Sequence, residues 1–344
     1  MRRAALAALT FLLVTAARAV APATYLRNGP TEYVNLIDVC GRLGLRFVFS
    51  RDGRTMTVQG GVHVAEFFPY SESKREVIFD GVRLYLGDLE IQRGGRIYVS
   101  RTDYEHRLIG LFRPDLLNPP LRRPHVIILD PGHGGPDPGT QNFRRHLQEK
   151  TLTLDVALRL KPILEAQGWT VIMTRTRDIQ LVPDKIKDLE MRARLAGQYR
   201  ADVFLSIHFD AGPNESTHGS MILSYNPAGQ RSSKSWGGRS DAQGRPMPGN
   251  RWDGWNAVLA NCVFHHLPHW LGTSDSGERI QDISVLRNNA DCPAVLVEPA
   301  YLSNDAEAQR LQNPAFREQI AETLAAGLKD YAQTIALLPT RTVR

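Results

Sequence analysis

A short apolar segment that ends in a glycine-rich loop constrains the fold of this chain more than any other feature. Residues 126–129 (VIIL) are β-prone and are followed at once by DPGHGG at residues 130–135. A run of this kind, bounded by turn residues, predicts a buried strand whose carboxyl end leads into a loop. Open parallel sheets bind their ligands at such strand ends. The sequence therefore predicts an α/β fold with a ligand site at this loop.

Apolar strands alternate with amphipathic helices over residues 125–338. The expected strands are 125–129, 170–174, 202–207, 219–224 and 294–298, and the expected helices are 149–167, 188–199, 252–267 and 313–336. Alternation of this kind predicts a mainly parallel sheet with helices on both faces. Residues 226–251 are rich in Gly, Ser, Arg and Pro, which indicates a long surface loop, with a lid or an autoinhibitory element as open alternatives.

Residues 24–112 have a different texture, with short β-prone segments between turn signals and a helical pattern near 35–44. We expect a small α+β domain there, followed by a proline-rich linker at 113–124, because the 344 residues suffice for two cores. The order of helix, strand pair, GGRIYVS strand and helix resembles the N-terminal domain of copper amine oxidases. The likeness implies no copper site, and a wall-binding or regulatory role is expected.

The N-terminus has the three regions of a secretory signal. Arg2 and Arg3 precede an apolar run at 4–17, and residues 17–19 (ARA) have the small-x-small form of a cleavage site. This predicts a signal peptide at 1–19 and export to the periplasm or cell envelope, with a buried N-terminal helix as the alternative. The apolar run is too short for a transmembrane anchor, so none is expected.

Charge and cysteine content limit the partners and the redox state. Loss of the signal would lower the formal charge from +6 to +3. This mild excess favours an anionic polymer, and without basic runs interleaved with aromatics it does not indicate nucleic acid. The three cysteines leave two arrangements open: a Cys262–Cys292 disulfide with Cys40 free, or three thiols.

Two histidines and a glutamate occupy element ends of the predicted sheet. His133 and His208 each follow a strand, and Glu149 begins a helix. Two imidazoles and one carboxylate form the ligand set of catalytic zinc sites, which keep a fourth position open for water. Glu298 ends strand 294–298 and is placed to move a proton. Taken singly, the histidines could only form local hydrogen bonds, Glu149 could be a first-turn acid that the helix dipole stabilises, and Glu298 could pair with Arg287. Together the four residues favour a zinc site.

Other candidates have weaker patterns. His265 and His269 in HHLPH are four apart, but Pro268 interrupts the helix that would align them. Trp252 and Trp255 could stack on sugar rings, although their spacing is more typical of core packing. Arg192 is expected in a salt bridge. Gly134 and Gly135 could let the substrate approach the backbone, or they could only form a tight turn. Arg287 could bind a substrate carboxylate, or it could form a structural ion pair. The substrate-binding candidates are Gly134, Gly135, Asp210 and Arg287.

Several motifs in order resemble one enzyme family over residues 125–336. They are DPGHGG, the EK helix start, MTRTRD, SIH and VLRNNADCPAVLVEPAYLSN. They resemble the zinc-dependent N-acetylmuramoyl-L-alanine amidases, specifically the division-associated amidases of the bacterial envelope. The resemblance implies one Zn²⁺ at His133, Glu149 and His208, with Glu298 as the catalytic carboxylate. It further implies cleavage of the amide between N-acetylmuramic acid and L-alanine of the peptidoglycan stem peptide, and an activator protein at the division site.

Two places depart from that family's pattern. Phe209-Asp210 stands where small residues and Asn are usual, and Pro299-Ala300 where a small residue and Gly are usual. Neither removes a ligand, and Asp210 could orient His208 or contact substrate. Two other functions therefore stay open: a non-catalytic peptidoglycan-binding or regulatory protein, and a zinc peptidase or deacetylase acting on another cell-wall bond.

Overall fold

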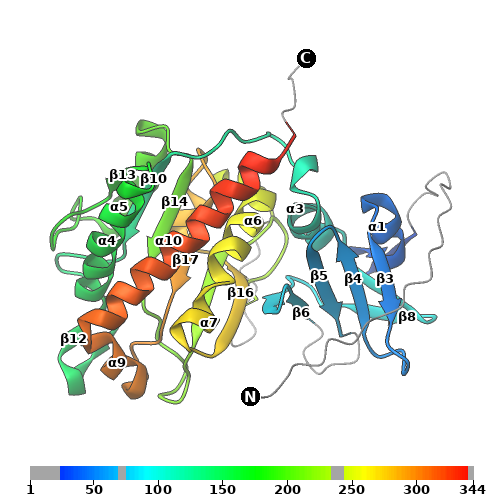
Figure 1. The fold of residues 1–344 in the computed structure, drawn as a ribbon, viewed down its shortest axis with the longest axis horizontal. Helices are drawn as coiled ribbons and strands as arrows, with labels where there is room; N and C mark the ends of the chain where they lie inside the picture. Colours follow the sequence, from blue (N-terminus) through cyan, green and yellow to red (C-terminus); the bar gives the residue numbers. More distant parts are fainter. Residues whose placement is uncertain (1–23, 69–74, 234–243, 340–344) are drawn as a thin grey trace.

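The computed structural model describes residues 24–68, 75–233 and 244–339, shown in Figure 1. The predicted signal peptide at 1–19 lies outside the described residues, as do residues 234–243 of the predicted surface loop. No helix within the described ranges combines the length and the apolar character that crossing a membrane requires.

The main sheet has its parallel strands where the sequence predicts them. Its strand order is β13-β10-β14-β17-β15-β16-β7-β6-β5-β4-β3. The first four strands are parallel: β13 (Thr170–Met173), β10 (Val126–Pro131), β14 (Val203–Ile207) and β17 (Ala294–Glu298). The next two, β15 (Ser220–Tyr225) and β16 (Asp275–Gln281), are parallel to each other and antiparallel to β17. The predicted mainly parallel α/β fold is confirmed, and β16 is an additional strand.

Helices cover both faces of this sheet because successive strand residues point to opposite sides. Ile127 and Leu129 pack in one buried cluster and Ile128 in another. The first face carries α4 (Glu149–Ala166), α6 (Asp253–Phe264) and α10 (Pro314–Leu337), with α7 (Leu267–Leu271) and α9 (Asp305–Gln312) against α10. The second face carries α5 (Lys185–Gln198) and α8 (Ser284–Arg287). A two-residue hairpin, β11 (Gln141–Asn142) and β12 (Leu147–Gln148), leads into α4.

The N-terminal part, residues 24–112, has its own helix and short strands, and we call it the module. The predicted helix is α1 (Leu36–Leu43), and it ends at Gly44 with φ +68°, a conformation that favours glycine. A second sheet holds β1 (Tyr25–Asn28), β2 (Thr31–Asn35), β9 (Arg96–Ser100) and β8 (Ile91–Arg93). Short helical segments follow it: α2 (Arg101–Asp103), a π-helical turn (Tyr104–Leu108), α3 (Ile109–Phe112) and a 3₁₀ turn (Pro114–Leu116).

The module's other strands extend the main sheet. These antiparallel strands are β3 (Arg46–Phe49), β4 (Met56–Gly60), β5 (His63–Phe67), β6 (Glu76–Phe79) and β7 (Val82–Tyr85). Strand β7 pairs with β16, with Leu84 opposite Glu278. The expected α+β module is confirmed, and its continuity with the α/β part through β16 and β7 is a finding that the sequence did not predict.

All three cysteines are thiols. Cys40 and Cys292 are buried and Cys262 is partly buried. Burial is the main cause that raises the pKa of each thiol to about 12. Of the two arrangements that the sequence left open, the structure has the one without a Cys262–Cys292 disulfide.

Candidate functional site

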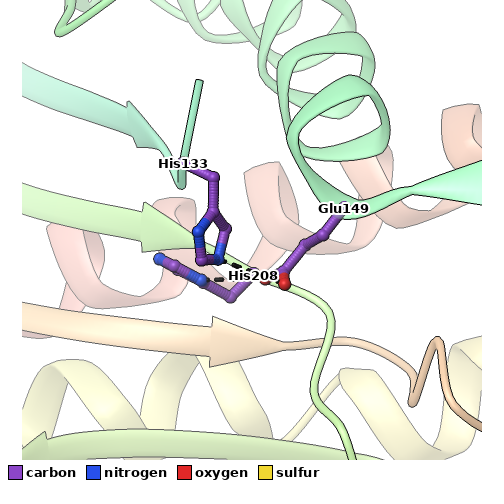
Figure 2. A group of neighbouring side chains, drawn as sticks. All are labelled: His133, Glu149 and His208. Carbon is purple, nitrogen blue, oxygen red and sulfur yellow. Dashed lines mark hydrogen bonds and ion pairs between the residues drawn. The ribbon is translucent and has the colours of Figure 1, made fainter. Parts of the chain in front are cut away.

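His133, Glu149 and His208 converge at the carboxyl edge of the parallel strands, as Figure 2 shows. His133 follows β10, His208 follows β14, and Glu149 is the first residue of α4. One ligand atom from each side chain lies within 4.8 Å of the others. Among the residues that the structure describes, this is the single group of three such side chains with metal-ligand spacing. The structure therefore brings together the three residues that the sequence singled out.

The Glu149 carboxylate is the centre of this group. Its side chain is 4% exposed, and its two oxygens lie 2.9 Å from His208 Nδ1 and 3.1 Å from His133 Nε2. The backbone N–H groups of Phe209 and Thr140 also donate to it, at 3.0 and 2.7 Å. Burial alone would raise the pKa of Glu149, but the hydrogen bonds with the two imidazoles outweigh burial and hold it well below its ordinary value. The carboxylate is therefore ionised, as a metal ligand must be.

Glycines allow this close approach, but they are not the two that the sequence emphasised. A Cβ on Gly132 would lie 2.3 Å from His208 Cε1, and a Cβ on Gly139 would lie 2.6 Å from both Glu149 Oε2 and His133 Cδ2. Gly134 and Gly135 instead form a turn that packs against the backbone of residues 179 and 180. For these two the geometry matches the tight-turn alternative.

Asp137 contacts the free side of the His133 ring. Its Oδ2 lies 3.0 Å from His133 Nδ1 and 3.1 Å from Lys185 Nζ. Burial raises the pKa of Asp137, but the hydrogen bond and charge of His133, with the hydrogen bonds from Lys185 and the Gly139 N–H, together outweigh burial and lower it to about 2. A carboxylate on the second ring nitrogen fixes the orientation of a metal-binding imidazole. The sequence analysis missed Asp137, although its place four residues after His133 in the same loop was a usable signal.

A buried ion pair supports the loop from the α5 side. Arg192 on α5 donates to Asp130 Oδ1 at 3.0 Å, and both side chains are 2% exposed. Arg192 also donates to the carbonyl of His133 at 2.7 Å, which ties α5 directly to the ligand loop. Burial raises the pKa of Asp130, but the charge of Arg192, the hydrogen bonds from the Thr174 and Ser206 hydroxyls and the charge of His208 together outweigh burial and keep the pKa below its ordinary value. The predicted salt bridge of Arg192 is thus an ion pair between elements.

A second buried arginine holds the same loop. Arg175 donates from Nε to the carbonyl of Pro131 at 2.9 Å, and from Nη2 to the carbonyls of Gly132 and Lys150 at 2.8 Å each. It therefore joins the loop to the first turn of α4, where Glu149 lies. Arg175 falls in the MTRTRD segment, and sequence reasoning gave it no role.

Glu298 ends β17 on the same face of the sheet as His208. Ile207 pairs with Val297, and the N–H of His208 donates to the carbonyl of Val297 at 2.9 Å. Because Ile207 and Val297 both pack on the α4 side, the next residue on each strand points to the α5 side. Glu298 is 6% exposed. A buried carboxylate therefore stands one strand away from the His208 imidazole.

The two remaining substrate candidates lie in different places. Asp210 forms a bridge to Tyr301 and lines a cavity at the edge that holds His208. Arg287 lies at the opposite edge, because β16 runs antiparallel to β17 and ends level with Ala294 rather than Glu298. It pairs with Asp282 at 2.6 Å, not with Glu298. We therefore leave Arg287 out of the proposed substrate site.

The competing sequence candidates also have structural contacts that explain them. Trp252 and Trp255 are buried, and their Nε1–H groups donate to the carbonyls of Ala290 and Pro119. His266 Nε2 lies 2.7 Å from Asp330, and no metal-like group of three forms around HHLPH within the described residues. The tryptophans are core residues, and the structure gives no geometric support for a metal at this motif.

Comparison with known proteins finds that a family profile and named relatives match the chain over the region that holds the site. The sequence profile of the N-acetylmuramoyl-L-alanine amidases matches residues 127–330. The chain is 37% identical over 235 residues to the amidase AmiC of Neisseria meningitidis serogroup B, covering 63% of this chain and 54% of that protein. It is 30% identical over 215 residues to the germination-specific amidase of Bacillus subtilis, covering 60% and 79%.

A solved structure gives a further comparison. The catalytic domain of CwlV from Bacillus (Paenibacillus) polymyxa var. colistinus has a TM-score of 0.49 at 27% identity, covering 61% of this chain and 98% of that domain. The chain spans about half the length of the AmiC proteins that it matches, including the one from Escherichia coli at 31% identity.

Proposed function

The chain belongs to the N-acetylmuramoyl-L-alanine amidase family, and from this we propose that it hydrolyses the amide between N-acetylmuramic acid and L-alanine in peptidoglycan. The observation that carries the proposal is the convergence of His133, Glu149 and His208 within 4.8 Å, inside the matched region. The altered neighbours Asp210 and Pro299 leave this group intact. A pseudoenzyme would be expected to lose at least one of the three.

The donor set fits zinc. Two imidazole nitrogens and a carboxylate oxygen are its usual catalytic ligands, and tetrahedral bonds of 2.0–2.2 Å separate donor atoms by about 3.3–3.6 Å. The Glu149 oxygens already lie 2.9 and 3.1 Å from the two imidazoles, so little rearrangement is needed. The ionised Glu149 and the Asp137 contact that orients His133 are the other features such a site requires.

In the proposed reaction, the residues of the chain have separate roles in proton transfer and in positioning the ligands. Zinc, when bound, lowers the pKa of water to about 7 and polarises the substrate carbonyl. Glu298 takes the proton of the attacking water and returns it to the alanine nitrogen as the C–N bond breaks. Arg192 and Arg175 hold the loop that carries His133, which fixes the distance between the ligands before substrate arrives.

The product of the reaction tests the proposal. Digestion of purified peptidoglycan, followed by mass spectrometry, is expected to release intact stem peptides with a free alanine amino group. A strong chelator should abolish release, and added Zn²⁺ should restore it. Zinc at about 100 times its Kd should also stabilise the fold by about 2.7 kcal/mol. Shortened peptides would indicate a peptidase, free acetate a deacetylase, and no product a binding protein; each would contradict the proposed reaction.

Gly139→Ala is expected to weaken zinc binding by at least about tenfold, because the new Cβ would meet Glu149 and His133 at 2.6 Å. The measurement is competition with a chromogenic chelator. Gly168→Ala is the matched control: Gly168 also has positive φ, but nothing lies within 4 Å of its added Cβ. Equal loss of zinc affinity in the two variants would mean that backbone strain, not contact with the ligands, is responsible.

Location and partners follow from the substrate. We propose that the protein acts in the cell envelope, where peptidoglycan lies, and that it reaches the periplasm through the signal sequence predicted at residues 1–19. An activator protein at the division site stays a prediction. The boundaries 24–112, 113–124 and 125–338 are likewise proposed as module, linker and catalytic domain.

A further inference from the structure

A cavity of about 520 Å³ lies beside the candidate metal site, and part of its wall comes from the module. The loop that begins at Asp210 forms one side, and Tyr301 lies next to it. Strand β16 contributes Arg279, and strand β7 of the module contributes Arg83 and Tyr85. The cavity therefore begins two residues beyond His208 and ends on a part of the chain outside the family match at 127–330.

The strand register places Glu298 and Arg279 on one face of the sheet. Met221 on β15 is opposite Glu298, and Leu223 is opposite both Leu296 and Arg279. Residues opposite one another share a face, and so do residues two apart on a strand. Glu298 and Arg279 therefore project to the same side, two strands apart.

The module's strand continues this face. Glu278 pairs with Leu84, so the following residue on each strand, Arg279 and Tyr85, lies on the other side of the sheet. Three strand spacings separate β17 from β7, which is about 14 Å. An extended peptide covers about 3.3–3.6 Å per residue, so this span corresponds to about four residues.

Arg279 is a cation held in place by neutral groups. Its guanidinium carbon lies 3.7 Å from the centre of the Tyr85 ring. Its Nε donates to the carbonyl of Ser276 at 2.8 Å and its Nη1 to the carbonyl of Ser233 at 3.1 Å. No carboxylate in the described ranges 24–68, 75–233 and 244–339 forms an ion pair with it. The side chain is thus oriented without being neutralised.

Asp210 lies toward the other end of the cavity, whereas Asp275 at the start of β16 also lines it and accepts a hydrogen bond from the N–H of Arg83 at 2.8 Å. Burial first, then the nearby carboxylates of Asp210 and Glu298, raises the pKa of Tyr301, while Arg279 opposes the shift. Tyr301 forms a bridge to Asp210 and lines the same cavity as Arg279. A ligand carboxylate is favoured away from Glu298, next to Arg279.

We propose that this cavity receives the peptide arm of the substrate, with Arg279 binding a carboxylate of that arm and Tyr85 of the module holding Arg279 in position. This rests on the proposed amidase function and extends it. A stem peptide ends in a carboxylate, and a guanidinium pairs with a carboxylate through two parallel hydrogen bonds. The module would then form one wall of the substrate site.

The test compares a short and a long substrate. N-acetylmuramoyl-L-alanine is too short to reach Arg279, whereas an N-acetylmuramoyl tetrapeptide with free carboxylates spans the cavity. Arg279→Gln is expected to raise KM for the tetrapeptide by about 10–100-fold, with kcat changed by less than about threefold. KM for the short substrate should not change. Arg279→Lys should recover part of the loss, because it keeps the charge without the planar fork.

The control is Arg93→Gln, which removes an exposed arginine from β8 of the module and should match the wild type. Equal effects of Arg279→Gln on both substrates would overturn the proposal, because they would assign the cavity to the glycan arm or to a structural role. If the wild type with zinc hydrolyses neither substrate, the proposed amidase function itself fails, which is a different result.

Equilibrium binding gives a readout that needs no turnover. Titration calorimetry of the metal-free wild type should show that the free tetrapeptide binds about 10–100-fold more tightly than the same peptide with its carboxylates converted to carboxamides. Arg279→Gln should abolish this preference. Equal affinity of the two peptides for the wild type would overturn the proposal, and this comparison decides the matter even if circular dichroism shows that Arg279→Gln is unfolded.

Discussion

Glu298→Gln is expected to lower turnover of peptidoglycan by about 10²–10⁴-fold, while zinc content and folding stay at the wild-type level. Glutamine has nearly the shape of glutamate and keeps hydrogen-bonding capacity, but it cannot accept and return a proton. Glu298 lies one strand from His208 and is not one of the three ligands, so the site should still bind the ion. Release of stem peptides, with zinc measured by elemental analysis, checks both expectations.

The matched control for this variant is Glu322→Gln. Glu322 is an exposed residue of α10, so the substitution makes the same change in charge away from the site. It should leave turnover unchanged. Wild-type turnover by Glu298→Gln would show that another group moves the proton, and loss of zinc from it would show that Glu298 is needed for the metal instead.

Arg192→Met is expected to reduce the free energy of unfolding by about 3–5 kcal/mol, because it leaves the Asp130 charge buried without its cation. Both side chains of this pair are 2% exposed. The measurement is denaturant unfolding of the metal-free protein. Arg194→Met on the same helix is the control: its side chain is 76% exposed, and a change within about 0.5 kcal/mol is expected. Similar losses in the two variants would contradict the assigned role.

The pH dependence of this loss has a defined sign. In the wild type the pKa of Asp130 is lowered, so the pair stabilises the fold above the ordinary value of 3.8, and the effect is lost as the pH falls through the folded-state value. Without Arg192 the largest influence that lowers the pKa is lost, while burial stays and only the Thr174 and Ser206 hydrogen bonds and the charge of His208 oppose it. The pKa should therefore rise and the ionised form should cost stability. The difference between wild type and Arg192→Met should therefore be largest near neutral pH and shrink on acidification. Asp130→Asn combined with Arg192→Met should recover part of it.

The sequence predicted His133, Glu149 and His208 because the local sequence pattern is enough to place the strands and the helix that carry them. The run VIIL before DPGHGG marks β10, and a helix pattern that begins at Glu149 marks α4. Parallel strands bring their carboxyl ends to one edge, so His133 and His208 could be expected to meet without any knowledge of long-range contacts. Their convergence with Glu149 depends on these three elements alone.

What the sequence did not reveal depends on partners far along the chain. Strand β16 (DSGERIQ) has few apolar residues, since its Glu278 and Arg279 contact Asn261 and Tyr85 rather than a uniform apolar core. With β16 missed, nothing indicated that the sheet reverses direction after β17. A pairing of Arg287 with Glu298 therefore stayed open as an alternative, although the reversal takes Arg287 to the opposite edge.

The sequence predicted a glycine-rich loop at the site but not which residue each glycine contacts. The glycines were expected either to let the substrate approach or only to form a turn, whereas the loop needs glycines where the His208 and Glu149 side chains enter from other elements. Gly132 and Gly139 face the ligands, whereas Gly134 and Gly135 face residues 179 and 180. The sequence pattern of the loop alone does not indicate which glycines face the metal ligands.

The pairing of β7 with β16 has a consequence for how the chain can be divided. Removal of residues 24–112 would leave one side of β16 as an open edge, with amide and carbonyl groups available to strands of other molecules. The catalytic region alone would then tend to self-associate. The module thus protects its neighbour from intermolecular strand pairing, and this protection is independent of any part it has in substrate recognition.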